Sequence, residues 1–333
     1  MNPLLATFES LYRLGVDVEN WRRRRQQRRG AWPQRLPRPV LSVGNIVAGG
    51  AGKTPVVEAL AREWRSRGGH PAILSRGYRG GPQGNDEYQL LRRRIPQVPH
   101  RQNPRRYQAG LELLAEHPEI DLFLLDDGFQ HRRLHRDLDL VLLDATRPLG
   151  YGHCLPRGLL REPWSSLRRA DAFLITRQEE ASPQKVAILR TFLRQYFRGV
   201  PLSTARARCD GVRDPHGVSM ALPAEKRWAA FAGVGNVWAF FRTLERLGLP
   251  LAGTRSFADH HRYRAAELVE LSRWAQSLGA DALICTEKDG VKLEGHVGFG
   301  ELAPPIYQLQ FRFEIGSPHP LDLLQATGVK AGV

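Results

Sequence analysis

The chain has 333 residues, 42% of them hydrophobic and 25% charged, so it can bury one large core or two smaller ones and is not wholly disordered. Its 49 basic and 34 acidic residues give a net charge of +15, which fits a polyanionic partner such as nucleic acid or an acidic membrane surface. Only six of the 49 basic residues are lysine, so an arginine-rich genome could account for the excess, and bulk charge alone identifies no ligand.

Cysteine usage and hydropathy exclude several further classes. Cys154, Cys209 and Cys285 lie far apart without C-x-x-C spacing, so the sequence encodes neither a disulfide framework nor a zinc site. No apolar run reaches the roughly 18 residues of a spanning helix, and the N-terminus lacks the pattern of a signal peptide. We therefore expect a cytoplasmic protein with two globular units.

An amphipathic helix is expected near the N-terminus. Apolar residues recur at helical spacing over residues 4–18, and Trp21 and six arginines at positions 22–29 follow them. This combination is typical of a helix that lies in the headgroup layer of an anionic bilayer. The alternatives are packing on the core with a solvated basic segment, and nucleic-acid binding. Three acidic residues weaken the membrane hypothesis: Glu9, Asp17 and Glu19.

The most informative segment has the pattern of a phosphate-binding loop. The apolar run 40–43 leads into GNIVAGGAGKTP, which an amphipathic segment over 56–64 follows. Glycines let backbone N–H groups converge on a phosphate, while Lys53 would reach the terminal phosphates and Thr54 would ligate magnesium. Val47 replaces the glycine of the strict pattern, so this is a variant loop. The predicted nucleotide-binding residues are Ala48, Gly49, Gly50, Ala51, Gly52, Lys53, Thr54 and Pro55.

Short apolar runs that alternate with longer amphipathic segments predict the fold class. Continuous apolarity indicates strands buried on both faces, and hence a mainly parallel sheet flanked by helices. The runs are 40–43, 71–74, 120–125, 138–143, 171–175, 228–234 and 282–285. Gly, Pro and Asp accumulate at 210–226 and suggest a boundary. We predict an α/β P-loop NTPase-type fold with an N-terminal amphipathic helix and basic segment at 1–38, a P-loop kinase domain at 39–225, a smaller α/β domain at 226–313 and a tail at 314–333.

Two adjacent carboxylates follow the run 120–125. Asp126 and Asp127 stand at the carboxyl end of a buried strand, where a P-loop enzyme places its second magnesium contact, directly or through water. The alternative for such a pair is a loop cap. The preceding phosphate-loop pattern favours the metal-side role.

Several motifs, in a fixed order, carry a resemblance to a known family. They are SVGNIVAGGAGKTP, LSRGYRGG, LDDGFQHRRLHRDLDLVLLD, LPRGLLREP, FAGVGNVWAFF, FADHH and TEKD. From about residue 40 to about residue 290 the chain resembles the tetraacyldisaccharide 4′-kinase (lipid A 4′-kinase) family. The resemblance implies transfer of the ATP γ-phosphate to the 4′-hydroxyl of tetraacyldisaccharide 1-phosphate in lipid A (lipopolysaccharide) biosynthesis, with Mg²⁺. It implies peripheral attachment to the anionic cytoplasmic face of the inner membrane and no nucleic-acid partner, and the oligomeric state stays open.

The resemblance also assigns catalytic residues. Lys53 would handle the phosphates, and Asp126 and Asp127 would organise the metal side. The family's catalytic aspartate maps to Asp86, where Asn85 and Tyr88 replace a glycine and a proline of the family's G-D-E-P segment.

Three further positions follow from the same resemblance. The family's functional histidine aligns with His260 rather than His261, and an aspartate–histidine pair would accept the proton of the attacking hydroxyl. The two partners belong to different predicted domains, so the pair would assemble on closure. Glu162 would support the metal, which makes Thr54, Asp127 and Glu162 the predicted magnesium residues.

One competing class remains open at this point. Loops of the form x-G-G-x-G-K-T also occur in nucleotide-switched ATPases that position a partner on membranes or DNA. Many of these carry a second lysine at the position of Ala48, so its absence argues mildly against this class.

Overall fold

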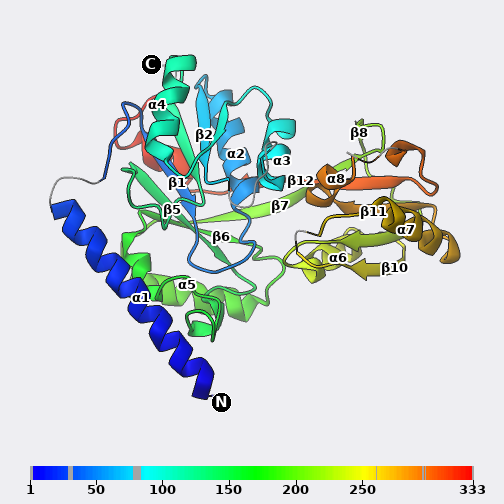
Figure 1. Cartoon of the computed structure of the whole chain (residues 1–333), viewed down its shortest axis with the longest axis horizontal. Coiled ribbons are helices and arrows are strands. Elements are labelled where there is room, and N and C mark those ends of the chain that lie inside the picture. Colours follow the sequence, from blue (N-terminus) through cyan, green and yellow to red (C-terminus); the bar gives the residue numbers. More distant parts are fainter. Residues whose placement is uncertain are drawn as a thin grey trace. The chain divides into compact units, whose positions relative to one another are not determined.

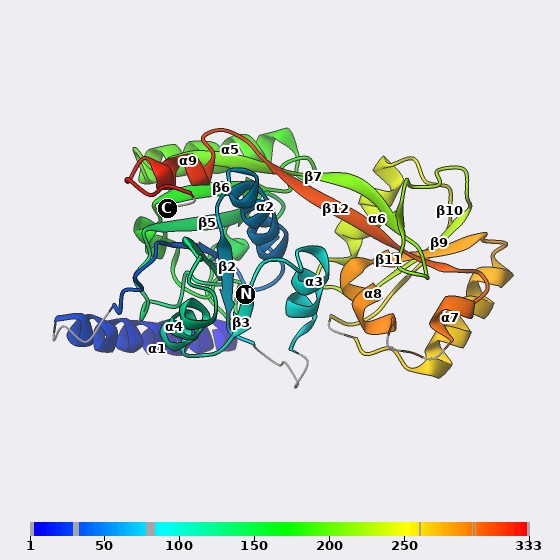
Figure 2. The ribbon, with the colours of Figure 1, turned by 90° about the horizontal axis from the view of Figure 1, so that it is seen from above.

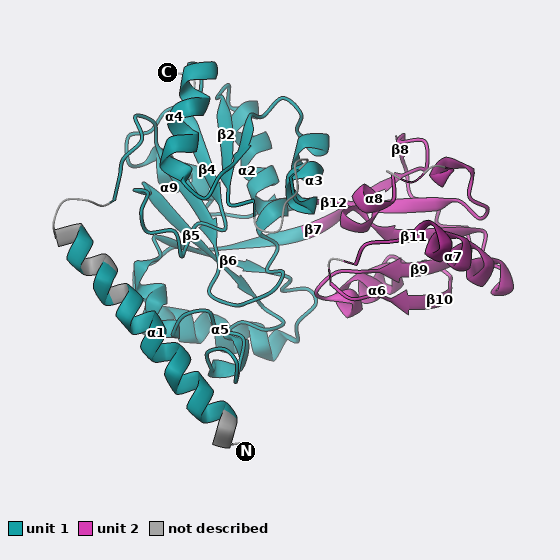
Figure 3. Ribbon diagram, in the orientation of Figure 1, with its two compact units in different colours: residues 1–206, 313–333 teal, residues 207–312 magenta. Residues whose placement is uncertain are grey.

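The computed structural model describes residues 3–28, 33–77, 84–259, 261–294, 296 and 298–331. The chain forms two compact units, one of residues 1–206 and 313–333 and the other of residues 207–312 (Figure 3). The helices are α1 (Pro3–Arg28), α2 (Lys53–Ser66), α3 (Asp86–Arg94), α4 (Arg106–Glu116), α5 (Pro183–Tyr196), α6 (Val237–Arg246), α7 (Ala265–Ser277), α8 (Glu287–Leu293) and α9 (Pro320–Gln325). The strands are β1 (Val40–Gly44), β2 (Pro71–Ser75), β3 (His100–Gln102), β4 (Leu122–Asp126), β5 (Leu138–Asp144), β6 (Ala172–Thr176), β7 (Leu202–Arg213), β8 (Ser219–Met220), β9 (Trp228–Ala232), β10 (Leu251–Ser256), β11 (Ala282–Thr286) and β12 (Ile306–Ile315).

The first unit is built on a parallel sheet with the strand order β7-β6-β5-β1-β4-β2-β3 (Figure 1). Its central strands are continuously buried, which is why their sequences are apolar on both faces. Strand β1 pairs with β4 so that Val43 lies opposite Asp126. This register brings the carboxyl end of β4 beside the start of the phosphate-binding loop.

Helices cover both faces of this sheet. On one face, α2, α3 and α9 pack on alternate residues of β1, β4 and β5, and Trp64 is fully buried there. On the other face, α5 covers β5 and β6, and α4 covers β4. Helix α1 runs alongside the same unit (Figure 2), and Tyr12 packs against the α5 cluster. The predicted α/β fold with a mainly parallel sheet flanked by helices is confirmed.

The second unit carries its own parallel strands in the order β10-β9-β11-β12. Helix α6 packs on one face through Phe240, Phe241 and Leu244, and helices α7 and α8 pack on the other. The predicted strands at 228–234 and 282–285 correspond to β9 and β11.

The compact units divide the chain at different places from the predicted domains. Strand β7 crosses from the first unit into the second at residues 206 and 207, ahead of the predicted boundary at 225 and 226. Strand β12 returns the chain to the first unit at residues 312 and 313. Residues 314–333, expected as a tail, include α9, whose Leu321 and Leu324 are fully buried in the first unit. The Gly- and Pro-rich segment 210–226 contains the turn between β7 and β8, so its composition reflects a hairpin.

Helix α1 is longer than the predicted 4–18, because it continues through the arginine cluster to Arg28. Across the residues described above, no helix combines the length and the apolar character needed to cross a bilayer.

Candidate active site

The phosphate-binding loop ends where α2 begins, at Lys53. Gly52 precedes the helix with φ 82°, and Gly49 has φ 107°, both in the left-handed region where a side chain would be strained. An ideal Cβ on Gly49 or Gly50 would meet nothing within 4 Å, so the space around this part of the loop is open. The first backbone N–H groups of α2 therefore point to a space that a phosphate can enter.

Side chains outside the loop hold it in place. Asn45 donates from its side-chain amide nitrogen to the backbone carbonyl of Val47, and the backbone carbonyl of Asn45 accepts from the Gln130 side chain. At the other end, the Thr176 hydroxyl donates to the carbonyl of Ala51 over 3.1 Å. The loop is thus tied to the segment after β4 and to the end of β6, which fixes it before any ligand arrives.

The loop and the segment after β4 also touch directly. An ideal Cβ on Gly44 would lie 2.5 Å from Cβ of Phe129, so only glycine fits at the end of β1. A side chain at position 44 would therefore displace Phe129 and the segment that follows β4.

A lysine, an aspartate and an arginine form the charged centre of the site. Lys53 Nζ lies 3.4 Å from Asp127 Oδ1 and 3.3 Å from Asn45 Oδ1. Arg161 places one guanidinium nitrogen 3.1 and 3.0 Å from the two oxygens of Asp127. Burial would raise the pKa of Asp127, but Lys53 and Arg161 outweigh it and hold this pKa below its usual value. Asp127 is therefore ionised at neutral pH.

Asp126 has a different environment. Its side chain is buried, and its Oδ1 has no hydrogen-bond partner among the described residues. Burial, followed by the nearby Glu87, raises its pKa to about 7, although Lys53 acts in the opposite direction. A buried acceptor without a donor, next in sequence to a second carboxylate, suits a hard cation that prefers oxygen ligands.

No group of three or more His, Cys, Asp or Glu side chains with metal-binding geometry occurs within residues 3–28, 33–77, 84–259, 261–294, 296 and 298–331.

The segment around Asp86 forms the N-terminus of α3. Asn85 caps this helix by accepting from the backbone N–H of Tyr88 over 3.0 Å, and it also accepts from Gln102 over 2.9 Å. The Tyr88 ring packs on His100, with ring centroids 4.6 Å apart. Asn85 and Tyr88, the two residues that differ from the family pattern, are thus joined by the capping hydrogen bond, and a regular helix begins at Asp86. The structure places Glu87 near Asp126, since Glu87 raises its pKa.

Glu162 follows Arg161 and is buried. It accepts from Arg169 over 3.1 Å, and the Arg169 guanidinium lies over the Phe129 ring, 4.2 Å from its centroid. Glu162 is therefore held beside the segment that follows β4. Its predicted support of the metal stays a prediction.

Comparisons with known proteins agree with this site. The family model for tetraacyldisaccharide-1-P 4′-kinase matches residues 1–327. The chain belongs to the tetraacyldisaccharide 4′-kinase family. A tetraacyldisaccharide 4′-kinase of Anaeromyxobacter dehalogenans is 40% identical over 287 residues, covering 80% of this chain and 75% of that protein. One of Pelobacter propionicus is 37% identical over 340 residues, covering 96% and 90%.

The fold comparison identifies a solved member of the tetraacyldisaccharide 4′-kinase family. LpxK from Aquifex aeolicus, solved in complex with ATP, superimposes with a TM-score of 0.75 and 28% identity, covering 98% of this chain and 99% of that one. The predicted membership of a kinase family is confirmed. The competing hypothesis, a nucleotide-switched ATPase that positions a partner, is not supported.

In this kinase, the second unit holds the remaining motifs. His260 lies outside the described residues, so its predicted role is not tested. His261 Nε2 lies 3.1 Å from Glu267 Oε1, and the His261 ring stacks on Phe257 with ring centroids 4.8 Å apart. These contacts give His261 a packing role within its own unit.

Asp289, from the TEKD motif, connects this motif with FAGVGNVWAFF and with Tyr263, which lies just after FADHH. It is fully buried and accepts from the backbone N–H of Gly233, from the Tyr263 hydroxyl and from the Thr286 hydroxyl, over 3.1, 3.1 and 2.7 Å. Thr286 in turn caps α8. Asp289 therefore acts as a structural centre of this unit.

Two arginines of the kinase site were missed from the sequence. Arg161 lies within the LPRGLLREP motif, but nothing in its spacing pointed to Asp127. Arg106, at the start of α4, is buried, and burial together with the nearby Arg76 lowers its pKa to about 10. The negative charges of Asp127 and Asp126 raise the pKa of Arg106, so this arginine is within electrostatic range of both carboxylates. Arg76 stood in the quoted motif LSRGYRGG, and Arg106 carried no sequence signal.

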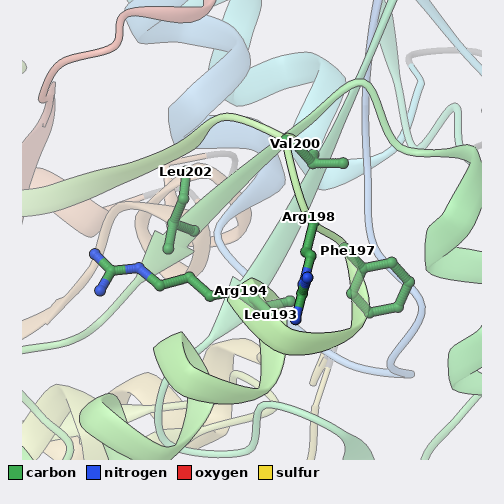
Figure 4. Close-up of a pocket in the computed structure, with 7 residues that line it drawn as sticks. Leu193, Arg194, Phe197, Arg198, Val200 and Leu202 are labelled. Carbon is green, nitrogen blue, oxygen red and sulfur yellow. The ribbon is translucent and has the colours of Figure 1, made fainter.

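A surface hollow elsewhere in the first unit is separate from these residues. Figure 4 shows it at the end of α5, and none of the predicted site residues lines it. Its labelled walls are Leu193, Arg194, Phe197, Arg198, Val200 and Leu202.

Proposed function

We propose that this protein transfers the γ-phosphoryl group of ATP to the 4′-hydroxyl of tetraacyldisaccharide 1-phosphate. The observation that carries the proposal is the contact of Lys53 with Asp127 at the opening of α2, in a chain of this kinase family. A lysine at the N-terminus of a helix, next to a strand-end carboxylate, is the arrangement that binds and neutralises the phosphates of ATP. The related Aquifex aeolicus structure, in complex with ATP, supports this choice of nucleotide.

Magnesium completes the charge balance in this proposal. Thr54, Asp127 and Glu162 would hold the ion, with Asp126 beside them. When bound, Mg²⁺ neutralises charge on the transferring phosphoryl group. The unpartnered Oδ1 of Asp126 and its pKa near 7 support a cation here, because a positive charge stabilises the buried carboxylate.

Asp86 is proposed as the group that accepts the proton of the attacking hydroxyl. It is the first residue of α3, directly after the capping residue Asn85. His260 is proposed to support it. A positioned base of this kind contributes about 10²–10⁴-fold in rate.

An anionic membrane surface is proposed as the partner of α1, at the cytoplasmic face of the inner membrane. With about 3.6 residues per turn, Leu11, Leu14 and Val18 fall on the side of the helix opposite Glu9. They are 59%, 60% and 42% exposed, and Trp21 near the arginine cluster is 60% exposed. Glu9 points inward and is only 7% exposed, so it does not oppose membrane contact. Apolar exposure of this kind beside basic residues suits the headgroup layer.

An assay with labelled ATP and the lipid disaccharide tests the proposal. Wild-type protein should transfer label to the lipid, and Lys53→Ala should lose this transfer. Lys185→Ala, an exposed lysine on α5, is the matched control and should keep it. Equal transfer by both variants would contradict the assignment of Lys53.

Vesicle flotation tests the membrane partner separately. The triple variant Phe8→Ser, Leu11→Ser, Leu14→Ser should float less with anionic vesicles than wild type. Ile188→Ser, which removes a 69% exposed apolar side chain from α5, should float like wild type. Equal flotation of all three proteins would remove the membrane proposal and leave the kinase proposal intact.

A further inference from the structure

Helix α1 has an inner face that differs from the rest of its surface. Glu9 is buried, and Tyr12 and Val16, one and two turns further on, are half-buried. The Glu9 carboxylate accepts from the backbone N–H of Cys154 over 3.1 Å and from Arg157 over 3.3 Å, and His153 lies 3.3 Å away. A buried carboxylate is costly unless donors surround it, so this contact is specific.

The electrostatics agree that Glu9 is held as a carboxylate. Burial alone would raise its pKa, but the Cys154 N–H, Arg157 and His153 lower it below the usual value. Every polar partner of Glu9 named here comes from one short segment, residues 153–157.

Tyr12 fixes the other end of the same segment. Its hydroxyl donates to the carbonyl of Arg161 over 2.9 Å, and its ring packs on the α5 core cluster. We call residues 153–161 the strap, because α1 holds it at both ends.

The opposite side of the strap is bonded to the phosphate-binding loop. Leu160 forms a β-bridge with Val47, Ala48 donates to the carbonyl of Leu159 over 2.7 Å, and the Arg161 N–H donates to the carbonyl of Ile46 over 2.7 Å. The strap therefore lies between α1 and the loop, with backbone hydrogen bonds to residues 46–48.

The strap also ends in a residue of the charged centre. Arg161, whose carbonyl Tyr12 holds, contacts both oxygens of Asp127, and Asp127 contacts Lys53. A continuous set of contacts thus leads from Tyr12 through Arg161 and Asp127 to Lys53.

We propose that Glu9 and Tyr12 are positioning residues for the nucleotide site, which act by holding the strap on the phosphate-binding loop. Because α1 holds the strap, a displacement of α1 from the first unit should change the affinity for ATP. The apolar side of the same helix faces outward, where the membrane is proposed to contact it. The inference rests on the proposed ATP-binding function, but it adds a role for α1 that membrane attachment does not require.

Nucleotide binding without lipid tests this inference. Affinity for a non-hydrolysable ATP analogue with Mg²⁺ is measured by calorimetry for wild type, Glu9→Gln, Tyr12→Phe and the double variant. The loss of one or two such hydrogen bonds should weaken binding by about three- to tenfold. Glu19→Gln, an exposed acid on the same helix, and Tyr196→Phe, an exposed tyrosine on α5, should bind like wild type.

A double-mutant cycle distinguishes positioning from a general loss of stability. In an Arg161→Ala background, Tyr12→Phe should weaken binding less than it does in wild type, because the part of its effect that depends on the Arg161 side chain is already lost, while the backbone bonds of the strap to residues 46–48 remain. A Tyr12→Phe protein that loses stability but binds the analogue with wild-type affinity would overturn the inference. Wild-type affinity of the protein that combines Glu9→Gln and Tyr12→Phe would also overturn it. If Glu9→Gln fails to fold, Tyr12→Phe decides, because it removes one hydroxyl and keeps the ring. No lipid is used in this experiment, so unchanged ATP-analogue affinity in the variants would count against the inference and not against the lipid kinase activity. Conversely, a protein that transfers no phosphate to the lipid, but whose ATP-analogue affinity depends on Glu9 and Tyr12, would count only against the proposed function.

Discussion

Arg161 contacts both carboxylate oxygens of Asp127 through a single guanidinium nitrogen, at 3.1 and 3.0 Å. Asp127 also contacts Lys53, so the arginine and the lysine share one carboxylate. This sharing links the strap to the residue that faces the nucleotide phosphates. It connects two residues from different motifs that lie 34 positions apart in the sequence.

Arg161→Ala should lower kcat/KM for ATP by about 10- to 100-fold. A hydrogen bond to a charged group contributes about 1.5–3 kcal/mol, and the variant also leaves Lys53 as the remaining cation beside Asp127. Steady-state kinetics with varied ATP measure the effect. Arg168→Ala, an exposed arginine in the neighbouring turn, should keep wild-type values. An unchanged kcat/KM in Arg161→Ala would show that the contact is not used.

The free energy of unfolding should fall between about pH 4 and pH 7 because of Asp126. Its pKa rises to about 7 in the fold, chiefly through burial, against a usual value near 3.8. Over this window the folded protein holds a proton that the unfolded chain has released, so stability declines as pH rises. Denaturant unfolding across this range should show a shallower decline for Asp126→Asn than for wild type. Burial also raises the pKa of Asp139, to about 6, but this residue is present in both proteins. Identical slopes for the two proteins would therefore contradict the assignment to Asp126.

Asn85→Ala should destabilise α3 and lower kcat. Loss of the N-cap costs about 1 kcal/mol, and it frees the residue that follows, Asp86. Asn85→Ser keeps an oxygen at the cap and should recover most of the stability and the rate. If kcat stayed constant while stability fell, the cap would serve folding alone.

The two neighbouring histidines should differ in what they affect. His260→Ala should lower kcat with little change in melting temperature, because His260 is proposed to support the base. His261→Ala should lower the melting temperature by several degrees, because it removes the contacts to Glu267 and Phe257. Calorimetric melting and initial rates separate the two effects. The opposite pattern would move the proposed role to His261.

Much of the fold follows from the sequence, because buried parallel strands are apolar on both faces. The runs around 40–43, 120–125 and 138–143 became β1, β4 and β5. Strands β7 and β12 were not predicted, since their burial alternates and their sequences contain several charged residues. The chain passes from one unit to the other within these strands, so amino-acid composition alone could not predict where the units divide.

The site was partly predictable for a similar reason. The loop at 48–55 and the pair Asp126 and Asp127 follow strands directly, so local pattern reveals them. Arg106 and Arg161 reach the site only through tertiary packing. The inward position of Glu9 could not be inferred either, because its partners lie about 145 residues away.

The central claim is that ATP bound at Lys53 phosphorylates a lipid sugar. The most direct measurement incubates the protein with γ-labelled ATP, Mg²⁺ and tetraacyldisaccharide 1-phosphate, and identifies the labelled position in the product. The account predicts one labelled phosphate at the 4′-position with wild-type protein and none with Lys53→Ala. ATP hydrolysis by wild-type protein without any label on the lipid would contradict it.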